Sequence, residues 1–237
     1  MRLSVQALAR LMDLSAVRAD VDETELRALV AEAARRRCVC VFPMPCWVPL
    51  AVASLADCPE VGVGGVVGFP SGATTTASKV AEARELLAAG VRELDMVINV
   101  GWLRSGHDQA VLDDLRAVVA AAGDVPVKVI LEVHWLTDDQ IRSGSELAVR
   151  AGAAFVKTAT GWTPTGATPH NVALIKAAVG DAAQVKAAGG VRDLATVVEL
   201  YRCGARRFGV SHVAGARILD ECAALPGGAV EVHAPVN

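Results

Sequence analysis

Short runs rich in valine and isoleucine alternate along the chain with longer stretches whose apolar residues recur at helical spacing. The short runs predict eight strands, at Leu11–Ser15, Cys38–Phe42, Val61–Phe69, Glu93–Val100, Val127–Val133, Ala154–Thr158, Gln184–Ala187 and Arg207–Ser211. The longer stretches predict helices at Glu23–Arg36, Pro49–Leu55, Ser78–Ala89, Gln109–Ala122, Asp138–Ala151, Pro169–Val179, Leu194–Cys203 and Val213–Ala223. Strict alternation of strand and helix is typical of a parallel sheet with helical crossovers.

Helix boundary signals and chain length favour closure of this sheet into a barrel. The segment Thr137-Asp138-Asp139-Gln140 places a cap residue three positions before a glutamine, and Gly152 stands where that helix is expected to end. A chain of 237 residues is close to the roughly 250 residues of a typical eight-stranded barrel. We therefore expect residues 1–237 to form a single (β/α)₈ TIM barrel whose residues 226–237 are a loosely ordered tail. A doubly wound open sheet is the alternative.

The composition limits the cellular compartments and the classes of partner that we expect for the protein. Hydrophobic residues make up 53% of the chain, yet no uninterrupted apolar stretch approaches the roughly 20 residues of a membrane span. The N-terminus lacks an apolar segment followed by a cleavage site, so we expect a cytoplasmic protein. A net charge of −3 gives no reason to expect a nucleic-acid partner. The six cysteines form no CxxC pair and fit reduced thiols in the core.

Lysine is scarce in this chain, so lysines inside predicted strands stand out. Asp95 lies in the fourth strand, Lys157 near the end of the sixth and Lys186 near the end of the seventh, where barrel enzymes place their active sites. Burial and a second cation both lower the pKa of an amine, and a neutral amine is suited to Schiff-base catalysis. Asp95 would supply a counter-charge and a proton relay. The alternative is a buried Lys–Asp–Lys network that only supports the barrel.

Two glycine-bearing segments are candidates for a phosphate site. Gly189-Gly190-Val191-Arg192 follows the seventh strand, and Gly209-Val210-Ser211-His212 closes the eighth. Barrels frequently bind phosphate with the loops after these strands, through backbone N–H groups that glycine leaves accessible. Further pocket candidates are Asp13, Ser15, Thr158 and His134. His134 fits an additional acid/base and a pocket-filling side chain equally well.

Several segments together resemble the deoxyribose-phosphate aldolase family of class I aldolases. The segments are Leu11-Met12-Asp13-Leu14-Ser15, Val67-Gly68-Phe69-Pro70-Ser71-Gly72, Glu93-Leu94-Asp95-Met96-Val97-Ile98-Asn99, Lys128-Val129-Ile130-Leu131-Glu132, Phe155-Val156-Lys157-Thr158-Ala159-Thr160-Gly161 and Val185-Lys186-Ala187-Ala188-Gly189-Gly190-Val191-Arg192. The resemblance runs from about residue 7 to residue 220, and its lysine-bearing motifs are specific.

The resemblance implies roles for individual residues. Lys157 matches the lysine that forms the imine, Lys186 the second lysine that perturbs it, and Asp95 the aspartate that relays protons through water. The segments that line the family's phosphate site contain Gly161, Gly189, Gly190, Arg192, Gly209 and Ser211, with His212 next to the last.

The reaction implied is reversible cleavage of 2-deoxyribose 5-phosphate to glyceraldehyde 3-phosphate and acetaldehyde. It needs no metal or other cofactor because the iminium is the electron sink. The expected partner is a small phosphorylated sugar or aldehyde, and barrels of this kind commonly form homo-oligomers.

The chain departs from the family pattern at positions near the expected pocket. Ala159 stands where the family has serine, His134 where a small side chain is usual, and His212 where serine or glycine is usual. The segment that begins at Phe42 is longer and more apolar than the family's. Two alternatives therefore stay open. One is the same imine chemistry on a different aldehyde pair, and the other is a non-catalytic barrel that binds a phosphorylated ligand.

Overall fold

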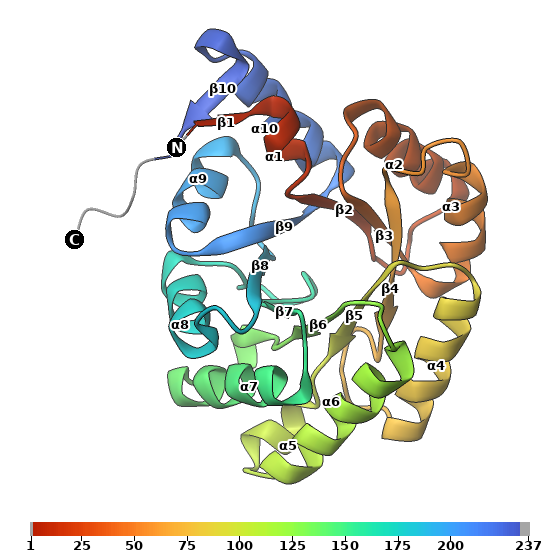
Figure 1. Ribbon diagram of the computed structural model, residues 1–237, viewed down its shortest axis with the longest axis vertical. Coiled ribbons are helices and arrows are strands. Elements are labelled where there is room, and N and C mark those ends of the chain that lie inside the picture. Colours follow the sequence, from red (N-terminus) through yellow and green to blue (C-terminus); the bar gives the residue numbers. More distant parts are fainter. Residues whose placement is uncertain (1, 233–237) are drawn as a thin grey trace.

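The computed structural model describes residues 2–232 of the chain. Eight parallel strands close into a barrel in chain order, at the centre of the view in Figure 1. They are β2 (Met12–Ala16), β3 (Cys40–Pro43), β4 (Gly62–Val67), β5 (Glu93–Val97), β6 (Val127–Ile130), β7 (Phe155–Lys157), β8 (Gln184–Ala188) and β9 (Ala205–Ser211). The prediction of a single (β/α)₈ barrel is confirmed, and the open sheet is excluded because β9 pairs with β2.

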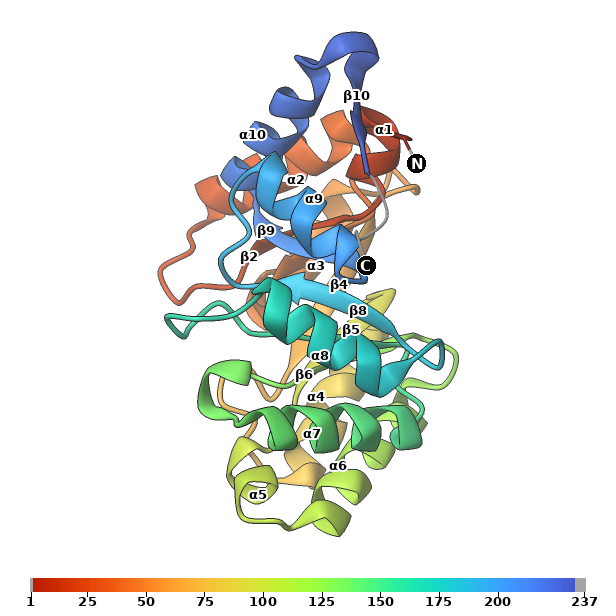
Figure 2. The ribbon, with the colours of Figure 1, turned by 90° about the vertical axis from the view of Figure 1, so that its left-hand side faces the viewer.

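Helices form a layer around the strands, as the view from the side in Figure 2 shows. They are α2 (Glu23–Arg36), α3 (Val48–Ser54), α4 (Thr76–Ala88), α5 (Val100–Arg104), α6 (Asp108–Ala122), α7 (Asp138–Ala151), α8 (Pro169–Val179), α9 (Leu194–Arg202) and α10 (His212–Ala223). Residues such as Leu14 of β2 and Leu94 of β5 alternate with charged neighbours and join the apolar core with the helices. This alternation leaves the other face of each strand free to carry polar side chains.

The chain ends differ from the expectation of a loose tail. Residues Ala229–Glu231 form β10, which pairs antiparallel with β1 (Arg2–Ser4), and η3 (Pro226–Gly228) leads into it. The expectation is wrong for residues 226–232 because the terminal segments cover each other: Leu3 and Val232 are buried, and the short helix α1 (Val5–Ala9) packs beside them. Residues 233–237 of the expected tail lie outside the described residues.

Two strands end three residues earlier than the hydrophobic pattern predicts. β5 stops at Val97, and Asn99 then caps α5 by accepting from the backbone N–H of Trp102. β6 stops at Ile130, and Glu132 takes a left-handed conformation (φ 56°) before the 3₁₀ turn η2 (Val133–Trp135). In both cases apolar residues continue past the strand because they are buried in the loops at the carboxyl ends of the strands.

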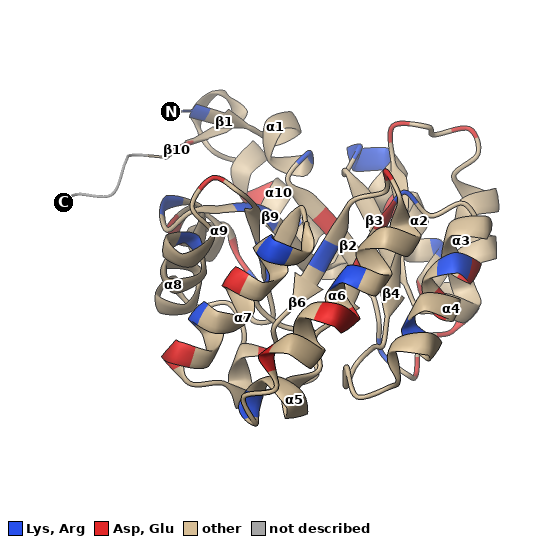
Figure 3. Cartoon of the chain, turned by 60° about the horizontal axis from the view of Figure 1, so that its bottom comes forward, with Lys and Arg blue, Asp and Glu red and all other residues tan. Residues whose placement is uncertain are grey.

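Most charged residues lie on the outer helices and loops, where both signs are mixed (Figure 3). Among the described residues, no helix combines the length and apolar character that crossing a membrane requires. The exceptions to this outer placement of charge are buried side chains on the barrel strands, and they form the candidate site.

Candidate active site

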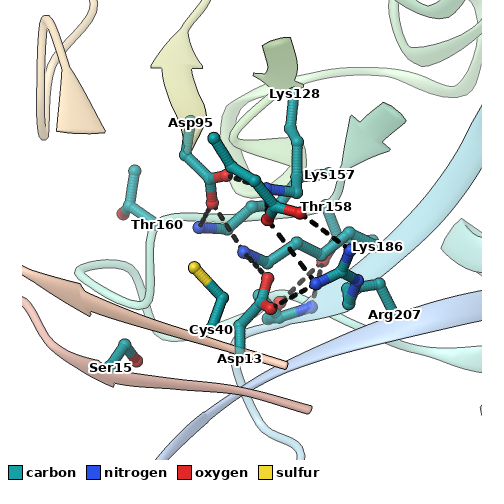
Figure 4. A network of polar contacts seen from close by, with 12 residues as sticks. Asp13, Ser15, Cys40, Asp95, Lys128, Lys157, Thr158, Thr160, Lys186 and Arg207 are labelled. Atoms are coloured by element: carbon teal, nitrogen blue, oxygen red, sulfur yellow. Dashed lines mark hydrogen bonds and ion pairs between the residues drawn. The ribbon is translucent and has the colours of Figure 1, made fainter. Parts of the chain in front are cut away.

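Strand register brings charged residues of several strands together inside the barrel (Figure 4). Asp95 of β5 is the register partner of Lys128 of β6, and Lys157 of β7 is the partner of Lys186 of β8. Aligned residues of parallel strands point to the same side of a sheet. Each pair therefore enters the barrel interior together.

Asp95 is fully buried and contacts three ammonium groups. Its Oδ2 atom lies 2.7 Å from Nζ of Lys157 and 2.7 Å from Nζ of Lys186. Its Oδ1 atom lies 3.1 Å from Nζ of Lys128. Burial alone would raise the pKa of this carboxyl, but the three ammonium groups outweigh burial and hold its pKa well below the ordinary value. Asp95 is therefore a carboxylate at neutral pH.

The contacts continue from Lys186 into a closed ring. Nζ of Lys186 forms an ion pair with Oδ2 of Asp13 at 2.6 Å, and Oδ1 of Asp13 accepts from Arg207 at 2.8 Å. Arg207 also donates to Glu93 at 3.0 Å, and Glu93 accepts from Nζ of Lys128 at 2.5 Å. Since Lys128 contacts Asp95, the circuit is complete. We call its members the charged ring: Asp13, Glu93, Asp95, Lys128, Lys186 and Arg207.

Lys157 is attached to the charged ring through Asp95. Burial lowers the pKa of its amine to about 8; Asp95 opposes this shift, whereas Lys186 and Lys128 add to it. The ring alternates three carboxylates with three cations, so a protonated Lys157 is a charge without a counterpart in the ring. The amine is thus the group of this cluster that loses its proton most readily near neutral pH.

Phe42 of β3 borders the ammonium groups. Its ring centre lies 4.0 Å from Nζ of Lys186 and 4.7 Å from Nζ of Lys128, within cation–π range. Gly64 of β4 makes this placement possible, because a Cβ atom at that position would come within 2.3 Å of the aromatic ring. The aromatic side chain displaces water from the cluster and so strengthens its electrostatic interactions.

A cavity of about 240 Å³ opens beside Lys157 at the carboxyl ends of the strands. Lys186, Asp13 and Ser15 also line it. The lining includes every glycine proposed for the phosphate site, together with Arg192 and Ser211, so the structure brings the two groups of predicted residues into one space: Gly161, Gly189, Gly190, Arg192, Gly209 and Ser211. Asp95 lies behind the two lysines and is not part of the lining.

The far end of the cavity has the features of an anion site. Gly189 and Gly190 have φ angles of 81° and 96°, a left-handed backbone that glycine adopts without strain. Ser211 caps α10 by accepting from the backbone N–H of Ala214. A helix N-terminus, accessible backbone and the guanidinium of Arg192 together suit a phosphate group.

Comparison with known proteins agrees with this geometry. The sequence profile of the DeoC/LacD family aldolases matches residues 7–213. The chain belongs to this aldolase family. The deoxyribose-phosphate aldolase of Klebsiella pneumoniae is 48% identical over 223 residues, which are 93% of this chain and 90% of that protein. The deoxyribose-phosphate aldolase of Sinorhizobium medicae is 44% identical over 230 residues, 97% of this chain and 93% of that protein.

Solved structures of aldolases share the fold of this DeoC/LacD family member. The tetrameric deoxyribose phosphate aldolase from Aeropyrum pernix superposes with a TM-score of 0.85 at 30% identity, over 94% of either chain. The aldolase QR15 gives a TM-score of 0.84 at 33% identity, over 90% of this chain and 94% of that one. The prediction that the protein is an aldolase, and hence a lyase, is confirmed.

Besides Asp95, three predicted residues of this aldolase do not line the cavity. The hydroxyl group of Thr158 donates to the backbone carbonyl of Ala188 at 2.6 Å and accepts from its N–H, which ties β7 to β8. Nδ1 of His134 lies 2.7 Å from the hydroxyl oxygen of Thr165 in a neighbouring loop. His212 is the first residue of α10 and not the last of a strand. Thr158 and His134 thus connect elements beside the site through their hydrogen bonds.

Sequence reasoning missed three members of the charged ring. Glu93 and Lys128 lie in segments that were expected to be strands, and Arg207 begins the strand expected at Arg207–Ser211. The sequence did contain a signal for Glu93. It lies two positions before Asp95, and residues two apart on a strand point to the same face of the sheet. What the sequence does not reveal is that all three converge across the barrel, since this depends on the stagger of its strands.

Glu132 fastens the loop that follows β7. Its carboxylate is buried and accepts from the backbone N–H of Thr160 at 3.3 Å, from the hydroxyl of Thr160, and from the hydroxyl of Thr163 at 3.0 Å. Gly161 and Trp162, which lie between these donors, both line the cavity. Glu132 therefore fixes this part of the wall although it does not line the cavity itself.

Trp162 joins loops from different sides of the barrel mouth. Its indole N–H donates to the backbone carbonyl of Val17 at 2.7 Å, and its ring stands edge-on to Phe69 at 6.1 Å between centres. It lines the cavity beside Lys157 and also a second one of about 470 Å³, whose wall includes Trp135 and Arg104. Trp162 is therefore the partition between the two spaces.

Among the described residues, one group of side chains inside the barrel has donor types that could hold a metal ion. Oxygen and sulfur atoms of Asp13, Cys40 and Glu93 lie within 4.8 Å of one another. Both carboxylates, however, already pair with cations of the charged ring. Burial also raises the pKa of the Cys40 thiol well above its ordinary value, which opposes the thiolate that a metal requires. This group is better suited to its ion pairs than to a divalent cation.

Proposed function

We propose that the protein is a class I aldolase that reversibly cleaves 2-deoxyribose 5-phosphate to glyceraldehyde 3-phosphate and acetaldehyde. One observation carries the proposal: the buried amine of Lys157 has a pKa of about 8 and lies in a cavity that ends in a phosphate-type site. An amine of this kind is a nucleophile near neutral pH. The names of the relatives support the same substrate.

The chemistry begins at Lys157. Its neutral amine attacks the aldehyde carbon of the open-chain sugar, and loss of water gives a protonated imine. Asp95, which accepts from Nζ at 2.7 Å, stabilises this positive charge. The imine is the electron sink for the following bond cleavage, so the step requires no metal or other cofactor.

Cleavage and release require proton transfers in the cavity. A base removes the proton of the C3 hydroxyl, the C2–C3 bond breaks, and its electron pair forms an enamine on Lys157 as glyceraldehyde 3-phosphate leaves. Protonation of the enamine and hydrolysis of the imine then release acetaldehyde. Lys186 lines the cavity and contacts Asp95 at 2.7 Å, so this pair with a water molecule is suited to carry the protons.

Most departures from the family pattern lie outside the cavity, which favours the usual substrate. Ala159 is fully buried, and neither it nor His134 nor His212 belongs to the lining. Phe42 does line the cavity, but it stands beside the lysines and away from the glycines of the phosphate site. The aldehyde end is thereby made tighter and drier while the anion end keeps its backbone donors.

The proposed setting follows from this activity. A small phosphorylated sugar is the partner, and degradation of deoxynucleotides in the cytoplasm is the process that would supply it. A homo-oligomer is the proposed assembly, with the tetrameric relative from Aeropyrum pernix as its support.

Two measurements test the proposed function. Borohydride reduction in the presence of 2-deoxyribose 5-phosphate is expected to add mass to the peptide that contains Lys157, and Lys157→Ala is expected to abolish cleavage. No adduct, or an adduct on another lysine, contradicts the imine mechanism. A coupled assay with the phosphorylated and unphosphorylated sugars side by side tests the substrate. Equal kcat/KM for the two would contradict the phosphate site.

A further inference from the structure

Besides Asp95, three members of the charged ring lie away from the cavity. Glu93, Lys128 and Arg207 are not part of the cavity lining, whereas Asp13 and Lys186 are. The side chain of Lys128 is 0% exposed and that of Arg207 is 11% exposed. Burying ion pairs of this kind brings little net stability, because the cost of removing the charges from water offsets their attraction. Their contribution is therefore to be sought in the chemistry of the site.

The arrangement of charges in the ring influences whether Lys157 carries a proton. The ring alternates three carboxylates with three cations and is neutral by itself. Lys157 meets it at Oδ2 of Asp95, an oxygen that Lys186 also contacts at 2.7 Å. If a ring cation were lost, the freed negative charge would hold Lys157 as an ammonium ion. If a ring carboxylate were lost, the excess positive charge would favour the neutral amine.

We propose that Glu93, Lys128 and Arg207 are positioning residues that complete a neutral ring and so leave Lys157 as its single surplus amine. They act through Asp95 and Lys186, either by direct contact or through another member of the ring. Lys128 contacts Asp95 at 3.1 Å, and Arg207 reaches Lys186 through Asp13. The inference rests on the proposed function for the use of the amine in forming an imine, but the protonation of Lys157 is measurable without turnover.

The groups that act on Lys157 come from strands around the whole barrel. Asp95 attracts its proton, and Lys186 and Lys128 repel it. The more distant charged groups are Asp13 on β2, Glu93 on β5 and Arg207 on β9. Cys40 on β3 stays an uncharged thiol because burial raises its pKa. The net effect of a substitution in the ring is therefore set by the sign of the charge it removes.

The test compares two substitutions of opposite sign. The rate of reductive methylation of Lys157 by formaldehyde and cyanoborohydride is measured against pH by peptide mass spectrometry, since the neutral amine is the form that reacts. Lys128→Met removes a cation and is expected to raise the pH midpoint by about one unit. Glu93→Gln removes a carboxylate and is expected to lower it by about one unit. Below the midpoint, these shifts are tenfold changes in rate in opposite directions.

The double variant Glu93→Gln/Lys128→Met provides the control, because it removes one charge of each sign and keeps the ring neutral. Its midpoint is expected to return close to that of the wild type. Unchanged midpoints in both single variants, or shifts of the same sign, would overturn the proposal.

If circular dichroism shows that Lys128→Met does not fold, Arg207→Gln takes its place. It removes a cation at a partly exposed position and is expected to raise the midpoint, and an unchanged midpoint there also overturns the proposal. Failure of the proposed function is seen separately, as absence of sugar cleavage by a wild-type protein whose methylation midpoint is still measurable.

Discussion

Lys157 donates to the carboxylate of Asp95 over 2.7 Å, and yet burial lowers the pKa of its amine to about 8. A lysine beside a carboxylate ordinarily keeps its proton. Here the same carboxylate oxygen also receives Lys186, so its attraction is divided between two amines. The contact therefore holds Lys157 in place for attack and stabilises the later iminium, while leaving the amine able to lose its proton.

The pH dependence of catalysis follows from this pKa. The amine is the reactive form, so kcat/KM for cleavage is expected to rise with pH through about 8 and then to level off. At pH 7 about a tenth of the protein would hold the neutral amine. A pH series of initial rates checks this, with Lys176→Met, a change at a partly exposed lysine of α8 that does not line the cavity, as the control. A rate that falls as pH rises from 6 to 8 would contradict the assignment.

The sequence predicted the barrel and the central lysines for a definite physical reason. Inward and outward residues alternate along a strand, so Lys157 and Asp95 within apolar runs had to face a polar interior. The same logic does not reveal which inward residues meet. The contact of Arg207 with Glu93 joins residues of β9 and β5 across the barrel, and it depends on the stagger of the strands. Sequence periodicity carries no information on how close Arg207 and Glu93 come across the barrel.

Loop residues were harder to predict than strand residues. His134 and His212 were placed near the pocket because each follows a strand, but His134 contacts Thr165, His212 begins α10, and neither lines the cavity. Trp162, by contrast, lines the cavity although its sequence context is an ordinary polar loop. Its position results from a hydrogen bond to Val17, a residue 145 positions away in the chain. Such tertiary contacts leave no local pattern.

Substitutions of Glu132 test the attachment of the loop after β7. Glu132→Ala leaves the N–H and the hydroxyl of Thr160 without their acceptor, which costs about 1–3 kcal/mol per buried group. We expect the loop to shift and KM for the phosphorylated sugar to rise about tenfold to a hundredfold. Reductive trapping of acetaldehyde on Lys157 is expected to change little, because that small aldehyde does not need the loop.

Glu132→Gln is the matched control, since it keeps one acceptor oxygen in the same place. It is expected to recover most of the affinity that Glu132→Ala loses. If both variants lost aldehyde trapping and sugar cleavage in parallel, with no separation of KM from kcat, Glu132 would be a general stabilising residue and the loop argument would be wrong.

Replacing Trp162 by a smaller residue is expected to widen the range of aldehydes that the protein accepts as substrates. Because this indole separates the cavity beside Lys157 from the neighbouring cavity of about 470 Å³, Trp162→Ala would join the two spaces. The added wall is formed in part by the indole of Trp135 and by Val100, which suits apolar or aromatic chains. Relative to acetaldehyde, kcat/KM for an aldehyde such as hexanal is expected to rise about tenfold or more.

Trp162→Phe separates the two contacts of the side chain. It keeps an aromatic partition next to Phe69 and loses the hydrogen bond to Val17. This variant is expected to retain the wild-type preference for small aldehydes with a modest loss of rate. Wider acceptance in both variants would instead show that the link to Val17 is what restricts the site, and unchanged preference in Trp162→Ala would show that the partition is elsewhere.

A second buried ion pair, remote from the cavity, is expected to matter for stability alone. Lys79 of α4 donates to Asp114 of α6 at 2.6 Å and to the backbone carbonyl of Val97 at 3.0 Å, and both side chains are at most 1% exposed. Lys79→Met leaves the carboxylate of Asp114 buried without its cation. Breaking such a pair on one side costs about 3–5 kcal/mol, measured as the free energy of unfolding in urea.

Replacing both partners removes the unpaired charge, so the double variant Lys79→Met/Asp114→Leu is expected to recover most of that loss. The kcat of the folded variants is expected to match the wild type, because neither residue lines the cavity or contacts the charged ring. A double variant that is less stable than Lys79→Met would contradict this, and would mean that the bond from Lys79 to the carbonyl at the end of β5 contributes more than the ion pair itself. In that case kcat is expected to fall as well, since that carbonyl follows Asp95 by two residues on the same strand.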